Sequence, residues 1–300
     1  MAFLQLRVAA RAPAIVSGIS RTVFTAISTR PQSCCERKKM PLDSAFLNES
    51  KSHRPLFPNV ELGGLPIAVS GPDEAADRIC ETAVSTTRIG RGIHLVNAYT
   101  IALADRNNEY AKILNQSSAN LPDGKPLTWF GRIRQSSLRQ VRGPHLFGNT
   151  IDRGRSKNVR HFLLGATEHT LIALREELHR RYPGVEIVGH LSPPFREMTN
   201  QEVKEQDAFI ASSGAHIVWV GLGTPKQDFE VSRLTRELPV VAIAVGAAFD
   251  FVAGSKVEAP AWMTRIGFEW LFRLATEPRR LWRRYLFGNV EFLWTMLRKR

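Results

Sequence analysis

The 300-residue chain has few cysteines and no hydrophobic run long enough to cross a membrane. Cys34 and Cys35 are adjacent and Cys80 stands alone, so their spacing supports neither a disulfide framework nor a set of metal ligands. The longest apolar stretch, residues 239–248, is far shorter than the roughly 20 residues of a spanning helix and is better interpreted as a buried strand. We therefore expect a cytoplasmic protein, kept in a reducing compartment, with no transmembrane helix.

Acidic residues are scarce at both ends of the chain, which carries a formal net charge of +13. Residues 1–55 and 260–300 each hold nine basic and three acidic side chains, whereas the residues between them hold 23 basic and 22 acidic ones. The excess positive charge therefore belongs to the two ends. Basic ends of this kind suit either nucleic acid or an anionic membrane surface.

The composition of residues 1–58 predicts a basic, disordered N-terminal extension. Its first forty residues are rich in Arg, Ser and Ala and contain no acidic residue before Glu36, which is typical of an organelle transit peptide. Two alternatives stay open: a basic extension that the protein keeps, or translation that begins at Met40. No catalytic residue is assigned to this segment.

The C-terminal segment, residues 259–300, combines clustered arginines with an apolar stripe. The stripe recurs at helical spacing and comprises Leu281, Trp282, Tyr285, Leu286, Val290, Leu293, Met296 and Leu297. An apolar stripe flanked by arginines, with Trp and Tyr as amphipathic anchors, is typical of a helix that lies in a membrane interface. The alternative is that the stripe packs on the protein's own core, and the two interpretations are compatible. We expect a helical, membrane-binding appendage.

Strands and helices are expected to alternate between residues 59 and 258. Short apolar, β-branched runs predict strands within 60–70 and at 93–97, 160–165, 185–189, 216–220 and 239–245. Amphipathic patterns predict helices at 72–87, 100–116, 202–213 and 227–237, and another that ends at Tyr182. This alternation favours a Rossmann-like α/β core with a mostly parallel sheet, covered by helices on both faces. The strands at 216–220 and 239–245 should be parallel neighbours.

Glycine-rich turns follow these two strands, at residues 221–227 and 245–250. Glycines let backbone amides approach a ligand, and Pro225 is placed to open the next helix with its free amides facing that ligand. Ligands of parallel sheets bind beyond the carboxyl ends of the strands, a rim that should hold Asn97, Gly165, Gly221 and Gly246. The turns thus predict an anionic ligand such as a nucleotide diphosphate. The alternative is that any parallel sheet needs glycine at its turns.

Further motifs accompany the glycine-rich turns in a fixed order. They are LPDGKPLTW at 121–129, VRGPHLF at 141–147, APAWM at 259–263, GFEWLFRL at 267–274 and EPRRLWRRY at 277–285. From about Leu62 to Leu293 the chain resembles the WecG/TagA/CpsF family of bacterial glycosyltransferases. The resemblance implies transfer of a sugar from a UDP-sugar donor to a saccharide on a polyprenyl diphosphate, with inversion and without a metal. It also implies a role in surface polysaccharide or exopolysaccharide synthesis and an assembly into dimers or trimers.

The resemblance assigns roles to individual residues. Asp123, between Pro122 and Gly124, falls at the position of the family's catalytic base, although an Asp before Gly is otherwise an ordinary turn residue. Gln227 matches an active-site Gln that would hydrogen-bond the sugar or its phosphate, and Asn97 matches an Asn near the donor sugar. The other residues expected around the substrates belong to the same motifs and are Gly124, Arg142, Gly143, Gly221, Gly223, Lys226, Gly246 and Asp250.

Cations are expected to replace a metal at the departing diphosphate. The chain has no Asp-X-Asp pair, which metal-dependent glycosyltransferases commonly carry. Arg273, Arg280 and Arg283 match the arginines that the family's C-terminal appendage brings to the diphosphate, and arginine can bind phosphate oxygens in pairs. For Arg280 and Arg283 the alternative is simple attraction to anionic lipid.

Two positions depart from the family pattern. Leu95 stands where the family often has Thr, and Gln140 stands where it has an active-site Arg. Arg139 or Arg142 could supply the missing cation, or donor preference and activity could differ. The donor sugar itself stays open among N-acetylmannosamine, its uronic acid and glucose.

Two other functions fit the sequence less well. A nicotinamide-dependent enzyme would need a third glycine in the turn at 221–227, and that turn lies far from the first strand. A nucleic-acid-binding protein would use the basic ends, but their aromatic residues accompany apolar helical positions and no recognised nucleic-acid motif is present. We therefore expect a glycosyltransferase bound peripherally to the inner face of the cell membrane.

Overall fold

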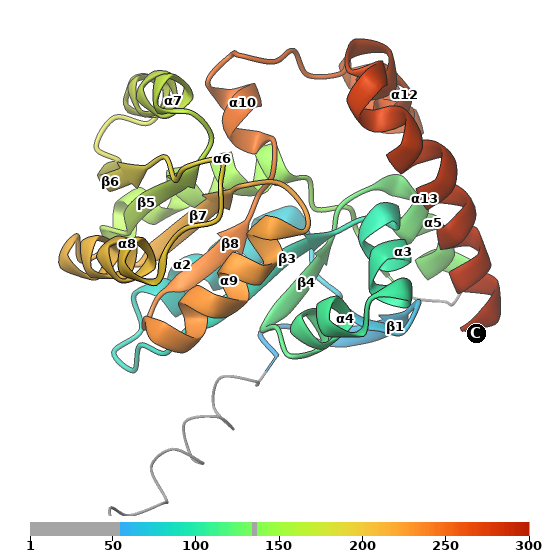
Figure 1. Cartoon of the computed structure of the whole chain (residues 1–300), viewed down its shortest axis with the longest axis horizontal. Coiled ribbons are helices and arrows are strands. Elements are labelled where there is room, and N and C mark those ends of the chain that lie inside the picture. The colour runs from blue at the N-terminus through green and yellow to red at the C-terminus, as the bar shows by residue number, and fades with distance from the viewer. Residues whose placement is uncertain (1–54, 134–136, 300) are drawn as a thin grey trace, which may run out of the picture. The chain divides into compact units, whose positions relative to one another are not determined.

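The structure, a computed structural model, describes residues 55–133 and 137–299 (Figure 1). At its centre lies a sheet of six strands in the order β4 (Ala119–Pro122), β3 (Arg91–Val96), β8 (Val241–Ala244), β7 (Ile217–Gly221), β5 (Arg160–Gly165), β6 (Glu186–Leu191). Every neighbouring pair in it is parallel. The predicted α/β fold is confirmed, as is the pairing of the two strands that precede the glycine-rich turns.

The central strands are buried on both faces, which explains their continuous apolar sequences. Along β7 the odd positions Ile217 and Trp219 join one hydrophobic cluster, and the even positions Val218 and Val220 join another. Successive side chains of a strand point to opposite faces, so each face of the sheet needs its own covering helices.

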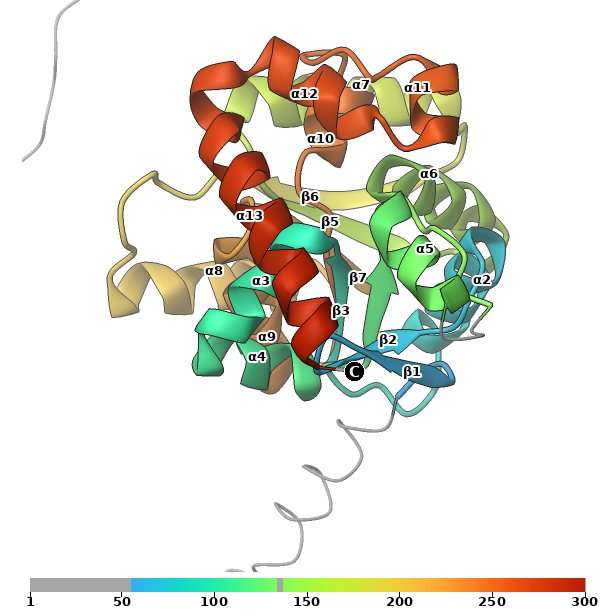
Figure 2. The ribbon, with the colours of Figure 1, turned by 90° about the vertical axis from the view of Figure 1, so that its right-hand side faces the viewer.

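The helices cover the two faces in separate groups (Figures 1 and 2). One face packs against α2 (Pro72–Ala83), α6 (Gly143–Gly154), α7 (Glu168–Arg181) and α10 (Ala248–Val252). The other packs against α8 (Asn200–Ser212) and α9 (Lys226–Glu237), with α3 (Ala98–Arg106) and α4 (Asn108–Asn115) beside them. A short 3-10 helix, η1 (Arg155–Lys157), follows α6.

The helix predicted over residues 100–116 is wrong in extent, because the structure has two helices there. Asn107 lies between α3 and α4 in an extended conformation, and its side chain accepts a hydrogen bond from the Tyr110 N–H at 3.0 Å. It therefore begins a new helix. Helix α2 also ends at Ala83, four residues before the predicted end at residue 87.

Strand β4 was not predicted from the sequence. It contains the buried polar residue Asn120, whose side-chain amide donates to the carbonyl oxygens of Pro66 at 3.0 Å and Leu114 at 2.8 Å. Pro66 belongs to an antiparallel hairpin of β1 (Asn59–Leu62) and β2 (Leu65–Ala68), which confirms the strands expected within 60–70. Both hydrogen bonds of the Asn120 amide thus go to residues outside the strand, and Pro66 is 54 positions away in the sequence.

A buried polar network fixes α9 to its neighbours. Asp228, in the first turn of α9, lies 2.8 Å from His94 Nδ1 of β3 and accepts a hydrogen bond from the Tyr110 hydroxyl of α4 at 2.9 Å. All three side chains are almost fully buried. Burial next to Asp228 raises the pKa of Tyr110, which keeps its hydroxyl protonated as a donor.

The C-terminal residues form three helices, α11 (Ala261–Ile266), α12 (Glu269–Thr276) and α13 (Pro278–Arg298). Helix α13 runs alongside α3 (Figures 1 and 2). The contact is close, because a Cβ on Gly288 would lie 3.1 Å from Tyr99 Cδ2. At its far end Arg298 and Lys299 pair with Asp105 at 2.7 and 2.9 Å.

Helix α13 has two apolar faces. Leu281, Phe292 and Met296 are buried against the body of the protein. A second set is exposed and comprises Trp282, Leu286, Phe287, Val290, Leu293, Trp294 and Leu297. The C-terminal helical region is thus confirmed, and part of the predicted stripe packs on the core while the rest faces outward. Among the described residues, no helix combines the length and the apolar character needed to cross a membrane.

Candidate active site

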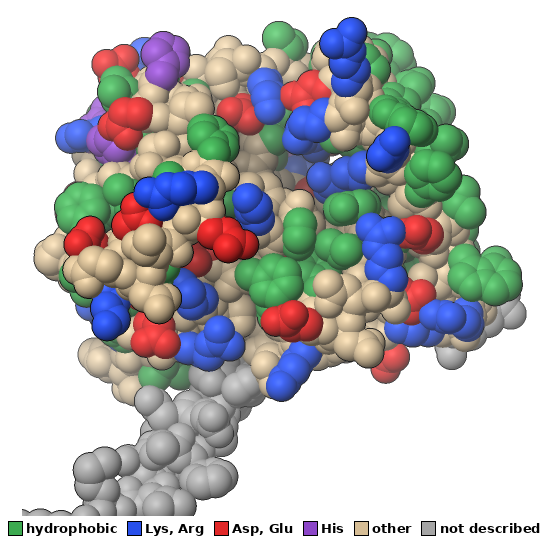
Figure 3. All heavy atoms as spheres, in the orientation of Figure 1, with side chains coloured by type: hydrophobic (Ala, Val, Ile, Leu, Met, Phe, Trp, Pro, Cys, Tyr) green, Lys and Arg blue, Asp and Glu red, His purple; other side chains and the backbone are tan. Residues whose placement is uncertain are grey.

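A cavity of about 300 Å³ lies where the carboxyl ends of β3 and β4 face the C-terminal helices. Its lining comes from α3, the turn after β4, α5 (Lys125–Ile133), α12 and α13. Charged residues in it are Asp123, Lys125, Glu269, Arg273 and Arg284. In Figure 3, Lys and Arg side chains surround the hollow beside the C-terminal helices. A concave site with converging charged groups is the natural place for chemistry.

Asp123 lies at the end of β4 beside the end of β3. Its backbone N–H donates to the Val96 carbonyl oxygen at 2.7 Å, which extends the pairing of the two strands by one residue. Gly124 follows with φ +127°, in a region that favours glycine, and the chain turns there into α5. The backbone thus holds the Asp123 carboxyl at the cavity wall, next to Asn97.

The pKa of the Asp123 carboxyl is raised to about 7, first because burial disfavours its charge and then because Glu269 is near. Arg273, Arg142 and Arg284 act in the opposite direction. A carboxyl with a pKa near neutrality can both accept and release a proton at physiological pH, which suits a general base.

We expect the pH dependence of kcat/KM to report this pKa. Because the base acts when ionised, activity should fall as the pH drops below about 7 and level off above it. Glu269→Gln removes a negative charge that raises the pKa, so the acid limb should move to lower pH. Rate profiles from about pH 5 to 9 for both proteins would measure the shift. An acid limb that stays in place in the Gln variant would contradict this account of Asp123.

Arg284 was not predicted as a site residue, yet it lines the cavity. Its guanidinium carbon lies 4.3 Å from the centre of the Tyr99 ring, a cation–π contact. Its buried Nε has no hydrogen-bond partner among the residues that the structure describes. Burial and the neighbouring Arg273 lower its pKa. A buried donor of this kind favours an anionic ligand.

The helical phase of α13 explains why Arg284 turns inward. Its buried residues Leu281, Gly288, Phe292 and Thr295 recur every three or four positions, and Arg284 falls in the same series. Gly288 and Thr295 are not strongly hydrophobic, so a search for apolar residues at helical spacing does not assign them to the inward face. That spacing is the sequence signal that could have identified Arg284.

Of the three arginines predicted at the diphosphate, Arg273 lines this cavity and the other two lie outside it. Arg273 Cζ is 5.6 Å from the centre of the Phe251 ring of α10. Arg280 is exposed, pairs with Glu277 and borders a separate groove with Lys256. Arg283 is exposed and stacks on Trp282, 5.2 Å from the ring centre.

Arg142 and Gly143 support the cavity from the start of α6. Arg142 pairs with Glu269 at 3.2 Å and with Glu258 at 3.3 Å. Gly143 is packed so closely that a Cβ would lie 3.1 Å from Leu95 Cδ1. Gln140 lines the cavity, whereas Arg139 packs beside Gly71. Of the two cations considered as replacements at Gln140, Arg142 is therefore the one that influences Asp123.

The remaining predicted residues gather at the ends of β7 and β8. Gln227 is buried, and its Oε1 accepts a hydrogen bond from the Gly223 N–H at 3.0 Å. A Cβ on Gly246, which has φ +58°, would lie 3.7 Å from the same oxygen. Gly221 packs under the Phe249 ring, where a Cβ would approach Cδ2 to 2.6 Å. Asn97, Gly165, Gly221 and Gly246 lie at the carboxyl ends of β3, β5, β7 and β8, so they share the predicted rim.

The expectation that the start of α9 offers free amides to a ligand is wrong for two of them. The Gln227 and Asp228 N–H groups donate to the carbonyl oxygens of Gly223 and Pro225, both at 3.0 Å. Pro225 is the N-cap of α9, and the tight turn before the helix already provides acceptors for these two amides. Lys226 is exposed at the first position of α9.

Asp250 lies in α10, which follows the turn at Gly246. It pairs with Lys256 at 2.8 Å, and Lys256 also pairs with Glu277 at 3.1 Å. These ion pairs connect the end of the β8 turn to the start of α13. The turns after β7 and β8 and the Asp123 cavity also lie side by side, because β8 pairs with β3 and all these strands end on the same side of the sheet.

Asn97 follows β3, the strand that lies between β4 and β8 in the sheet, and it lines the Asp123 cavity. It is the N-cap of α3, and its side-chain oxygen accepts from the Thr100 N–H at 3.2 Å and lies 3.3 Å from the Thr100 hydroxyl. The oxygen is therefore used by the helix, and the amide nitrogen is the end suited to a ligand. Within residues 55–133 and 137–299, no three His, Cys, Asp or Glu side chains are grouped so that they could hold a metal ion.

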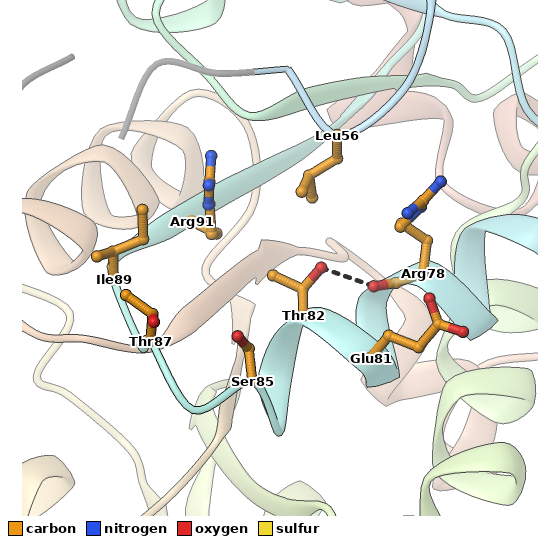
Figure 4. Close-up of a pocket in the computed structure, with 8 residues that line it drawn as sticks. All are labelled: Leu56, Arg78, Glu81, Thr82, Ser85, Thr87, Ile89 and Arg91. Carbon is orange, nitrogen blue, oxygen red and sulfur yellow. Dashed lines mark hydrogen bonds between the residues drawn. The ribbon is translucent and has the colours of Figure 1, made fainter. Parts of the chain in front are cut away.

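A second cavity, of about 280 Å³, lies near the amino end of β3 (Figure 4). Arg78, Glu81 and Thr82 of α2 line it, together with Leu56 and Arg91. The Thr82 hydroxyl donates to the Arg78 carbonyl oxygen at 2.7 Å, as the dashed line shows. This cavity is at the opposite end of the strand from Asp123, and none of the predicted site residues lines it.

Comparison with known proteins gives consistent matches. A profile of the glycosyl transferase WecG/TagA/CpsF family matches residues 60–300. A protein from Bacillus spizizenii, named N-acetylglucosaminyldiphosphoundecaprenol N-acetyl-beta-D-mannosaminyltransferase, is 32% identical over 185 residues, which cover 61% of this chain and 70% of that protein. A Bacillus subtilis protein of the same name is 29% identical over 201 residues, or 66% of this chain and 76% of that protein.

Proposed function

Because the chain belongs to the glycosyl transferase WecG/TagA/CpsF family, we propose that it transfers N-acetylmannosamine from a UDP-sugar to a saccharide carried on a polyprenyl diphosphate. The names of the two Bacillus relatives support this sugar and this kind of acceptor. The uronic acid of N-acetylmannosamine and glucose are the alternative donors. The product would extend a lipid-linked precursor of a surface polysaccharide or exopolysaccharide.

The observation that carries the proposal is a carboxyl with a pKa near 7 in a cavity that also contains two arginines. Asp123 takes the proton of the acceptor hydroxyl, and the acceptor oxygen forms a bond to the anomeric carbon of the donor. The bond between that carbon and the phosphate oxygen breaks, and UDP leaves from the opposite side. This single displacement inverts the anomeric configuration.

The two substrates are assigned to the two parts of the sheet edge. The donor lies over the turns at Gly221, Gly223 and Gly246, where Gln227 contacts its sugar or phosphate. Arg273, which leans on α10 beside these turns, stabilises the departing diphosphate. The acceptor enters the Asp123 cavity. Arg280 and Arg283 could reach the diphosphate only from outside this cavity, so their contribution should be smaller.

A donor screen is the direct test of this function. UDP release would be measured with each of the three UDP-sugars and an N-acetylglucosaminyl-diphosphate acceptor that carries a short lipid. Release that depends on the acceptor, together with a glycosylated product, would support the proposal. Acceptor-independent hydrolysis, or no release with any donor, would refute it.

We further propose that the exposed apolar face of the C-terminal helices binds an anionic membrane at the inner face of the cell membrane. In Figure 3 hydrophobic side chains gather along the right-hand edge, over α12 and α13. Exposed apolar residues of α11, α12 and α13 include Trp262, Leu271, Trp282, Leu286, Val290 and Trp294. The exposed Arg279, Arg280 and Arg283 add positive charge beside them, as in peripheral membrane helices.

Replacing Trp282 and Trp294 together by Ala should weaken binding to anionic liposomes about tenfold or more. Both rings are exposed, so their removal leaves the buried face of α13 intact. Transfer to a detergent-solubilised acceptor should therefore persist. Liposome cosedimentation would measure binding, with the exposed Ile172→Ala of α7 as a matched control. Stronger retention on duplex DNA than on liposomes at matched salt would favour nucleic acid as the partner instead.

Activity is expected to survive an excess of EDTA. The prediction rests on the absence of an Asp-X-Asp pair and on the arginines of the cavity, which can neutralise a departing diphosphate. Initial rates of UDP release would be compared before and after chelation and gel filtration. An enzyme that loses its activity and regains it with magnesium or manganese would show that a metal does this work.

A further inference from the structure

The lining of the Asp123 cavity is chemically divided. Asp123, Glu269, Arg273 and Arg284 give it a charged part. Helices α5 and α13 also contribute a group of apolar side chains, Trp129, Phe130, Phe292 and Leu293, beside the polar Lys125, Tyr285 and Asn289. The rings of Phe130 and Phe292 meet edge to face with centres 5.4 Å apart, so these two helices touch at the cavity wall.

The apolar part continues to the protein surface. Trp129 is 48% exposed and Leu293 is 49% exposed, although both line the cavity. Their neighbours Ile133, Val290 and Trp294 are exposed as well, and the last two belong to the face that we assign to the membrane. A hydrocarbon chain could therefore pass from a lipid layer into the cavity along these apolar side chains.

The charged part of the cavity is suited to a phosphate. Arg284 is the residue of α13 that lines the cavity with a buried, unpartnered donor nitrogen, four positions before Gly288 and eight before Phe292. Its stacking on Tyr99 holds the guanidinium plane in place. One face of one helix thus presents a cation and then apolar side chains, which is the order of groups in an isoprenoid diphosphate.

We propose that the space between α5 and α13 is a lipid subsite, which binds the first isoprenoid units of the acceptor while Arg284 binds the acceptor's diphosphate. The inference rests on the proposed function and extends it, because the enzyme then recognises the lipid tail as well as the sugar. Trp129 and Leu293 are the positions that contact the tail, and Arg273 is left for the departing UDP.

Two water-soluble acceptors test the subsite without detergent. Both carry the same N-acetylglucosaminyl diphosphate, and their tails are either two isoprene units or one butyl group. The wild-type KM should be about tenfold lower for the isoprenoid acceptor, a difference of about 1.4 kcal/mol. Leu293→Gln and Trp129→Ala should each remove most of this preference, because they raise the KM of the isoprenoid acceptor more than that of the butyl acceptor.

The exposed Ile172 of α7, which is 47% exposed, supplies the matched control as Ile172→Gln and should keep the preference. Arg284→Gln should raise the KM of both acceptors, because they share the diphosphate. Equal wild-type KM values for the two tails, or a preference that survives both variants, would overturn the lipid subsite and leave the proposed function standing. Failure of transfer to either acceptor with every donor would instead remove the proposed function.

Discussion

Replacing Asp123 by Asn should lower kcat by a factor of about 10² or more, because the amide keeps the shape of the carboxyl but cannot take the proton of the acceptor hydroxyl. The measurement is UDP release at about pH 8 with both substrates saturating, where the wild-type carboxyl is ionised. The KM values should change little. Near-normal kcat in the Asn variant would remove Asp123 from the role of base.

The stability of the same variant supplies a control for misfolding. The pKa of Asp123 is about 7 in the folded protein, above its ordinary value of 3.8, so the folded state holds the proton more tightly than the unfolded chain. The contribution of this group to stability is therefore full below about pH 4 and is lost as the pH rises to about 7. The amide of the Asp123→Asn variant does not titrate. The variant should accordingly melt at the same temperature as the wild type, or higher, at about pH 8.

Replacing either cavity arginine by Gln should reduce kcat/KM by about 10- to 100-fold on a soluble acceptor. Each of Arg273 and Arg284 would lose a charge-assisted contact to a phosphate, which is worth about 1.5–3 kcal/mol. Neither residue forms a salt bridge with a carboxylate in the described part of the chain, so the fold should tolerate the change. Kinetics with separately varied donor and acceptor would assign Arg273 to the donor and Arg284 to the acceptor.

Arg280→Gln and Arg283→Gln are the matched comparison, since they lie on the same helix as Arg284 but outside the cavity. We expect each to cost less than about fivefold on the soluble acceptor and to weaken liposome binding more clearly. If their losses equalled those of Arg273 and Arg284, the start of α13 would have to move onto the substrate during the reaction. The division of roles proposed above would then be wrong.

The parts of the fold that the sequence predicts well are those with local causes. The run from Ile217 to Val220 is apolar at every position, and such a run followed by glycine is typical of a buried parallel strand. Strand β4 could not be found in this way, because the polar side chain of Asn120 is satisfied there by partners outside the strand, on Pro66, Leu114 and Ser117. The break at Asn107 has a similar origin, since a single side-chain hydrogen bond to Tyr110 N–H decides between one helix and two.

In the candidate site, too, the features with local causes could be predicted and those that depend on distant residues could not. The resemblance of the motifs brought Asp123 into consideration, but the pKa near 7 depends on Glu269, 146 positions away in the sequence, and on burial. Arg284 is distinguished from Arg283 only by the phase of α13 against α3, which small residues such as Gly288 define. Both positions are arginine, so the sequence at these positions cannot tell them apart. Only the packing of α13 against the body of the protein determines which arginine faces the cavity.

The position of β8 has a consequence for how the protein is made. It is the last strand of the sheet in the sequence, yet it lies at the centre, between β3 and β7. Until residues 241–244 leave the ribosome, β3 and β4 on one side and β7, β5 and β6 on the other are separate pieces with unpaired edges. Asp123 follows β4 in the first piece, and Gly221 ends β7 in the second. The turn after β4 and the turn after β7 therefore come to lie on one continuous sheet only when this late four-residue strand pairs with both of its neighbours.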